Sequence, residues 1–185
     1  MFSNSLEGYF FGNLCILAIL FLLAAIRWGD WRNWKRYYPT ILFFIGGDLL
    51  KNTILHDHRM WKYQETLFLE EIFYGHLVIN LLVMAVIYPS TILIYLGRMP
   101  LEKGKRIFWI LFWVFIYITI ESINLHYDVI NHYHGWNMWW SLIFDIVMFV
   151  IFWIHHNKPL LAWAFSITWL IILWNMFNLS HNLLK

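Results

Sequence analysis

Apolar residues along this chain fall into long runs separated by short polar segments, not into the alternation of a half-buried strand. Each run is close to the length of about 18 residues that an α-helix needs to cross a bilayer. We therefore predict an all-α fold, a polytopic membrane bundle of six transmembrane helices. The predicted spans are Tyr9–Arg27, Tyr38–Leu55, a third that starts within Thr66–Glu71 and reaches at least Tyr88, Ile107–Leu125, Trp139–Ile154 and Leu160–Phe177.

The third span is followed directly by a proline. Pro89 is a candidate kink, because proline removes a helix hydrogen bond. The apolar residues 90–97 either extend this span or lie on the surface. No linker is long enough to separate two domains, so residues 1–185 are predicted to form a single transmembrane domain.

Composition supports a membrane protein. Of 185 residues, 61% are hydrophobic and 13% are charged, whereas a soluble domain carries about 25% charge. The 13 Trp, 10 Tyr and 16 Phe are typical of interfacial aromatic belts. A net charge of only +2 argues against nucleic acid as a partner. The expected surroundings are the lipid bilayer of the plasma membrane; composition predicts no oligomeric state.

Basic residues predict the orientation of the bundle. Cytoplasmic loops of membrane proteins are enriched in Lys and Arg. Nine basic residues lie in the loops after spans 1, 3 and 5, and three lie on the opposite side, so both termini are predicted to be extracytoplasmic. The nine are Arg27, Arg32, Lys35, Arg36, Arg98, Lys103, Lys105, Arg106 and Lys158; the three are Arg59, Lys62 and Lys185.

Polar side chains within the spans gather in the predicted outer half. Ionisable groups at membrane depth cost several kcal/mol each, so they normally face a cavity or a partner. Gathered at one depth, they predict a polar pocket that opens to the outside. The residues are Asp48, Lys51, Asn52, Glu70, Glu71, His76, Asn80, Glu121, Asn124 and Asp145.

Two stretches of the chain share one order of residues. Each has an acid within an apolar run, a His-x-His pair, a Trp and then an acid nine positions after that Trp. We interpret the match as an internal repeat of helix hairpins, spans 2–3 with spans 4–5, over residues 37–97 and 106–156; the alternative is coincidence in a chain rich in His and Trp. The pairs are Asp48 with Glu121, Asn52 with Asn124, His56 and His58 with His132 and His134, Trp61 with Trp136, and Glu70 with Asp145.

The carboxylates are the candidate catalytic groups. Lys51 lies one helical turn from Asp48 and is placed to pair with it. The other acids cannot all stay ionised in a low dielectric, so either some are protonated or a cation is bound. A protonated acid beside an ionised one suits acid–base chemistry. Alternatively, Glu70 and Glu71 begin the third span in the headgroup region and are simply hydrated. The candidate set is Asp48, Glu70, Glu71, Glu121 and Asp145.

The histidines form a candidate metal site. In extended backbone, His-x-His places both rings on one side, which is a workable ligand spacing. His56 and His58 with His132 and His134 would then hold zinc or copper. The alternative, which we favour, is that they are loop histidines and that no metal is bound. His76 is either satisfied by Glu71 or acts as a proton shuttle.

The residues from Trp28 to Phe73 resemble the membrane-embedded lycopene cyclase domain. That domain has a Trp/Arg-rich loop, an acid in the next span, a W-x-Y, and a glutamate pair led by proline and followed by Phe. The proline position is Phe68 here, and Asp145 has no neighbouring acid. The resemblance implies that the glutamate pair would protonate a polyene. The matching residues are Trp31, Arg32, Asp48, Trp61, Tyr63, Glu70, Glu71 and Phe73.

The whole chain also resembles a poorly characterised family of small Trp-rich polytopic membrane proteins from spore-forming Gram-positive bacteria. This resemblance implies a membrane location and no mechanism.

Three functions fit these features. The first is binding or acid–base processing of a lipophilic molecule in the outer pocket. The second is cation or proton transport by the same acids, and the third is a structural or sensory subunit whose polar groups join helices. The predicted ligand-binding residues are Lys51, Asn52, Trp61, His76, Asn80, Asn124 and Trp136.

Overall fold

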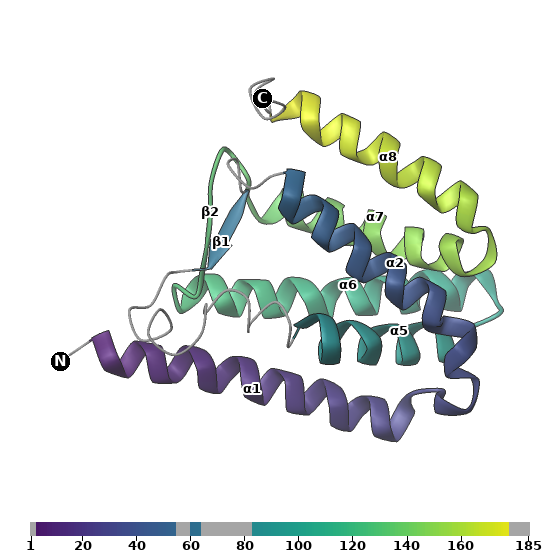
Figure 1. The fold of residues 1–185 in the computed structure, drawn as a ribbon, viewed down its shortest axis with the longest axis horizontal. Helices are drawn as coiled ribbons and strands as arrows, with labels where there is room; N and C mark the ends of the chain where they lie inside the picture. Colours follow the sequence, from purple (N-terminus) through teal and green to yellow (C-terminus); the bar gives the residue numbers. More distant parts are fainter. Residues whose placement is uncertain (1–2, 55–59, 64–82, 178–185) are drawn as a thin grey trace. The chain divides into compact units, whose positions relative to one another are not determined.

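The computed structural model describes residues 3–54, 60–63 and 83–177. The fold is all-α, as predicted, with one pair of short strands added. Figure 1 shows the elements in chain order. They are α1 (Ser3–Trp28), a 3-10 turn (Trp31–Asn33), α2 (Trp34–Ile54), β1 (Trp61–Tyr63), a π-helical segment (Val83–Ile87), α5 (Tyr88–Gly97), α6 (Lys103–His126), β2 (Ile130–His132), α7 (Met138–Asn157) and α8 (Pro159–Met176).

The chain forms two compact units. The first contains Met1–Ile41 and Tyr63–Arg98, and the second contains Leu42–Lys62 and Met99–Lys185. Helix α2 therefore begins in the first unit and ends in the second. It starts at Trp34, one turn before the predicted span, and includes Pro39.

In the first unit, α5 and the π-helical segment pack against α1. Residues 90–97 are helical, and Ser90–Leu96 are buried, so the apolar stretch after Pro89 continues as buried helix. Pro89 lies in the first turn of α5, directly after the π-helical segment, so the residue without an N–H falls where the helix changes from π to α geometry.

In the second unit, α7 packs against both α6 and α8. Aromatic contacts fill these interfaces: Phe149 of α7 contacts Trp113 and Tyr117 of α6, with ring centroids 6.1 and 5.1 Å apart. Phe43 of α2 stacks on His155 of α7 at 4.1 Å and meets Trp163 of α8 edge-on at 4.8 Å.

Helices α6, α7 and α8 are each long and apolar enough to cross a membrane, with mean hydropathies of 1.8, 1.8 and 1.5 over their most apolar windows. Their outward faces remain apolar: Phe108 of α6 is 72% exposed and Leu160 of α8 is 85% exposed. Burying such faces in lipid removes a large exposed apolar surface from water. The shorter apolar stretches Cys15–Trp28 and Val83–Gly97 are also helical.

Candidate functional site

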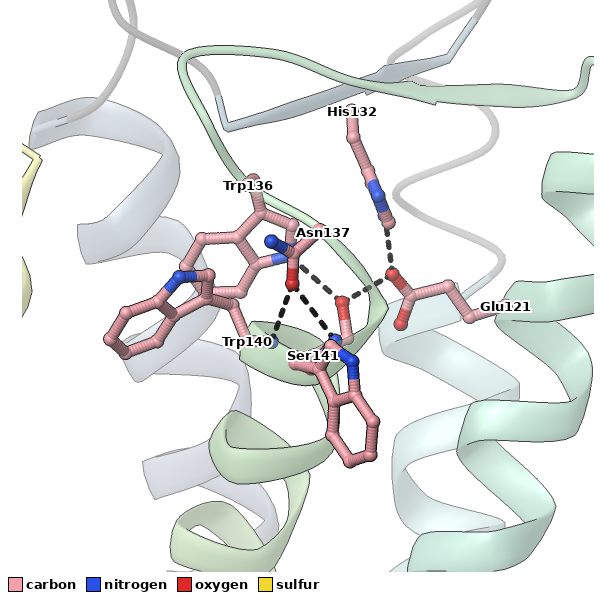
Figure 2. A network of polar contacts seen from close by, with 7 residues as sticks. Glu121, His132, Trp136, Asn137, Trp140 and Ser141 are labelled. Atoms are coloured by element: carbon pink, nitrogen blue, oxygen red, sulfur yellow. Dashed lines mark hydrogen bonds and ion pairs between the residues drawn. The ribbon is translucent and has the colours of Figure 1, made fainter.

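A chain of hydrogen bonds joins the end of α6 to the start of α7 (Figure 2). The indole Nε1 of Trp136 donates to Ser141 Oγ at 2.8 Å, and Ser141 Oγ donates to Glu121 Oε1 at 2.5 Å. The same carboxylate oxygen lies 2.7 Å from His132 Nε2. One oxygen of Glu121 therefore has two polar partners, Ser141 and His132.

The loop before α7 places these groups. Its turn uses two left-handed residues, His134 at φ 55° and Gly135 at φ 82°. Asn137 then caps α7, because its Oδ1 accepts from the backbone nitrogens of Trp139 and Trp140 at 3.0 and 3.3 Å. An Asn cap and an αL glycine fix the start of α7, and with it the position of Ser141 one turn inside the helix.

Trp136 anchors this loop. Its ring is buried in a cluster with Met60 and Leu173. The backbone nitrogen of Tyr133 also donates to Met60 O at 2.8 Å, next to the β1–β2 pair. Because the ring is packed and its Nε1 is directed to Ser141, Trp136 orients the Ser141 hydroxyl toward Glu121.

Asp145 lies one turn beyond Ser141 on the same buried face of α7. Its side chain is only 7% exposed, and Oδ2 has no hydrogen-bond partner among the described residues. Glu121 is close enough to act on it electrostatically. One turn further into the helix lies Phe149, which packs on Trp113 and Tyr117, so Asp145 lies where this interface changes from polar to apolar.

Asp48 belongs to a separate group on α2. Lys51 Nζ lies 2.6 Å from its Oδ1, which confirms the predicted pair, and Asn52 Nδ2 donates to Oδ2 at 3.2 Å. Both oxygens of Asp48 are therefore engaged by residues of its own helix. This acid is accounted for by local pairing, in contrast to Asp145.

The structure describes part of the predicted site. It joins Glu121 to His132 directly and to Trp136 through Ser141, with Asp145 one turn beyond Ser141. Asp48, Lys51 and Asn52 form a separate local set. Asn124 lies in the last turn of α6, where its backbone carbonyl accepts from Val129 N at 2.8 Å. Trp61 lies in β1. The predicted residues His56, His58, Glu70, Glu71, His76 and Asn80 lie outside the described residues.

Ser141 was missed by sequence analysis. It is the one hydroxyl residue in the apolar stretch from Met138 to Asp145, and it precedes Asp145 by four positions. That i, i+4 spacing places both side chains on one helix face, and it is the signal that identifies Ser141. His132, one of the four predicted metal ligands, lies beside Glu121.

Within residues 3–54, 60–63 and 83–177, no group of three or more His, Cys, Asp or Glu side chains is arranged to hold a metal ion. The expectation of extended backbone is wrong at the second histidine pair, because β2 ends at His132 and His134 adopts a left-handed conformation. That change of backbone direction removes the reason for both rings to share one side.

A second polar site, also not predicted, lies in the first unit. Asn33 Nδ2 donates to both oxygens of Asp30, at 3.1 and 2.9 Å, and Tyr37 Oη donates to Oδ2 at 2.8 Å. These hydrogen bonds, that from Asn33 foremost, hold the pKa of Asp30 below its usual value. Burial, with the bond to Asp30, raises the pKa of Tyr37 to about 12.

Comparison with known proteins gives no relative: no family model, no curated protein and no solved structure matches this chain.

Proposed function

We propose that this chain is a plasma-membrane protein with six spans and extracytoplasmic termini, which binds a lipophilic molecule at Asp145 and Glu121 and exchanges a proton with it. The membrane assignment is supported by three helices of sufficient length and hydropathy, and by their exposed apolar faces. The orientation is supported by the excess of basic residues in the loops after spans 1, 3 and 5.

One observation carries the functional part of this proposal: the Asp145 carboxyl group is buried, and its Oδ2 has no partner among the described residues. A buried polar group without a hydrogen bond costs free energy, of the order of 1–3 kcal/mol. Proteins retain such groups mainly where a site requires them. A carboxyl oxygen without a partner, near a second carboxyl group, is suited to accept or donate a proton.

The two acids have different environments, and we assign them different roles. Glu121 accepts a hydrogen bond from Ser141 and lies beside His132, so one of its oxygens has two polar partners. Asp145 has only apolar neighbours one turn further along α7, so in this proposal it carries the transferable proton. Two carboxyl groups whose surroundings differ in this way are the usual arrangement for acid–base work.

The ligand is proposed to be lipophilic because of what surrounds the acids. Trp113, Tyr117 and Phe149 form the wall one turn deeper, and the flanking helices face lipid in this proposal. A molecule that enters from the bilayer would meet the exposed apolar faces of α6 and α7 first and the carboxyl groups with its polar or electron-rich part. The resemblance to lycopene cyclases points to the same kind of chemistry, and the proposed internal repeat would add the acids of residues 37–97.

The test is to identify what co-purifies with the protein. Wild-type protein is extracted into polymer nanodiscs, its bound lipophilic compounds are analysed by mass spectrometry, and Asp145→Asn is compared with Asp128→Asn. Asp128 is an exposed residue of the turn after α6, so the control makes the same chemical change outside the site.

We expect one compound to be enriched with wild type and with Asp128→Asn, and to fall at least about tenfold with Asp145→Asn. Identical profiles in all three proteins would contradict the proposal. A proton flux in proteoliposomes that is lost only in Asp145→Asn, with no compound enriched, would instead establish transport.

A further inference from the structure

Basic and aromatic residues alternate on the surface where α1 ends and α2 begins. Arg27, Arg32 and Lys35 are exposed and form no ion pair with any described residue. The tryptophans between them, at positions 28, 31 and 34, are exposed as well. Exposed cations are well hydrated, whereas exposed indoles leave apolar surface in water. Their alternation over ten residues therefore suits the boundary between water and lipid, where both kinds of side chain are favoured.

The acid nearest to these cations does not neutralise them. Asp30 is occupied by two neutral donors, Asn33 and Tyr37, from the same segment. Its principal stabilisation therefore comes from an amide and a phenol, and the adjacent basic side chains are left available for another anion. In an ordinary surface ion-pair network, Asp30 would pair with a neighbouring Arg or Lys. Here it accepts hydrogen bonds from Asn33 and Tyr37.

The segment is also held rigid. Trp31 Nε1 donates to Ala25 O at 2.6 Å, which ties its ring to the end of α1. Asp30 N donates to Leu93 O at 3.3 Å, and Arg98 Nε donates to Trp28 O at 3.0 Å. Because these bonds fix the backbone, the exposed cations are presented on a defined surface, and ordering them costs less on binding.

We propose that residues 27–36 form a docking surface for the headgroups of anionic phospholipids. Indole rings favour the interface between headgroups and acyl chains, and Arg and Lys bind phosphate oxygens. Charge complementarity favours this occupant, since the segment has four basic residues and its one acid is engaged internally. This inference does not depend on the function proposed for Asp145.

The experiment titrates purified full-length protein in detergent with phosphatidylglycerol and counts bound lipids by native mass spectrometry. The test variant is Arg27→Gln/Arg32→Gln/Lys35→Gln. The control, Lys103→Gln/Lys105→Gln/Lys158→Gln, removes the same charge from the other basic loops, where Lys105 is paired with Glu102.

Near an anionic surface each basic residue contributes about fivefold in affinity, so we expect about 100-fold weaker phosphatidylglycerol binding in the test variant. The control variant should stay within about threefold of wild type, and phosphatidylcholine should bind all three proteins equally. Equal losses in the test and control variants, or no loss in either, would overturn the docking surface.

A charge-conserving variant and a competition experiment test the surface further. Arg27→Lys/Arg32→Lys/Lys35→Arg keeps all three positive charges, so it should keep lipid binding. Loss of binding in this variant would overturn a surface that binds lipid through its positive charge. Inorganic phosphate should displace no more lipid than chloride of equal ionic strength. Displacement by phosphate alone would mean a site for the free anion, which also contradicts the proposal.

Discussion

Two aspartates, one in each unit, meet opposite conditions. Asp30 lies in the turn between α1 and α2, and both its oxygens accept hydrogen bonds from Asn33 or Tyr37. Asp145 lies within α7, is 7% exposed, and has an Oδ2 with no partner among the described residues. The more accessible acid is fully satisfied, and the buried acid is the one with an oxygen to spare.

The difference follows from local structure. In a turn, side chains three and seven positions away can fold back onto one carboxylate, as they do at Asp30. Inside a helix, the neighbouring side chains of Asp145 are those three and four positions away, and Ser141 is the one among them with a hydrogen-bond donor. Ser141 gives its hydroxyl to Glu121, and Phe149 has no donor. A satisfied acid stabilises a fold, whereas an unsatisfied buried acid weakens it and is therefore better explained by function.

Disrupting the surroundings of Asp30 should have the largest effect. A Cβ on Gly97 would lie 2.8 Å from Asp30 Cβ and 3.3 Å from its backbone nitrogen, so Gly97→Ala must push the two segments apart. We expect a loss of about 2–3 kcal/mol of unfolding free energy. Gly104→Ala is the control, since no atom lies within 4 Å of its added Cβ, and should change stability by less than about 1 kcal/mol. Equal effects of the two variants would mean that the Asp30 contact is not close packed.

Removing the Asp30 carboxylate should cost slightly less. Asp30→Ala deletes the acceptor for Asn33 and Tyr37, and we expect a loss of about 2 kcal/mol at neutral pH. Because the folded pKa of Asp30 lies below its unfolded value of about 3.9, its stabilisation is present above that pH and is lost as pH falls through the folded pKa. The gap between wild type and Asp30→Ala, measured by thermal unfolding, should therefore shrink below about pH 4. A gap that stays constant would show that the charge contributes nothing.

A smaller effect is expected from Ser141→Ala, which removes the link between Trp136 and Glu121. The variant takes an acceptor from Trp136 Nε1 and a donor from Glu121, so we expect a loss of about 1–2 kcal/mol. Ser166→Ala is a control, because that hydroxyl bonds back to Ala162 O within α8, and it should cost less than about 0.5 kcal/mol. If the two substitutions lower the free energy of unfolding equally, the hydrogen bond between Ser141 and Glu121 contributes no more to stability than an ordinary bond within a helix.

The helices were predictable because their signal is continuous. The long apolar runs predicted spans at Ile107–Leu125 and Trp139–Ile154. The structure has helices there, α6 at Lys103–His126 and α7 at Met138–Asn157. The candidate site was predictable in part, since Glu121 and Asp145 are acids within apolar helices. Their different environments were not predictable, because these depend on contacts between α6, β2 and α7.

The loop chemistry was the least predictable. The His-x-His pattern assumes extended backbone, and a single left-handed residue at His134 cancels it. The Asp30 site combines a turn with the first residues of α2, and no spacing rule for helices or strands describes it. The backbone geometry of local turns therefore determines how the His132–His134 pair is oriented and which partners Asp30 has.

Thermal unfolding of Asp145→Leu in nanodiscs tests the central claim most directly. Leu is close to Asp in shape and has no polar atom to satisfy, so replacing an unsatisfied functional carboxyl should leave stability unchanged or raise it, by up to about 2 kcal/mol. Asp30→Ala, measured in parallel, should lose about 2 kcal/mol. If Asp145→Leu loses as much as Asp30→Ala, Asp145 holds the helices together and is not the reactive group of a site.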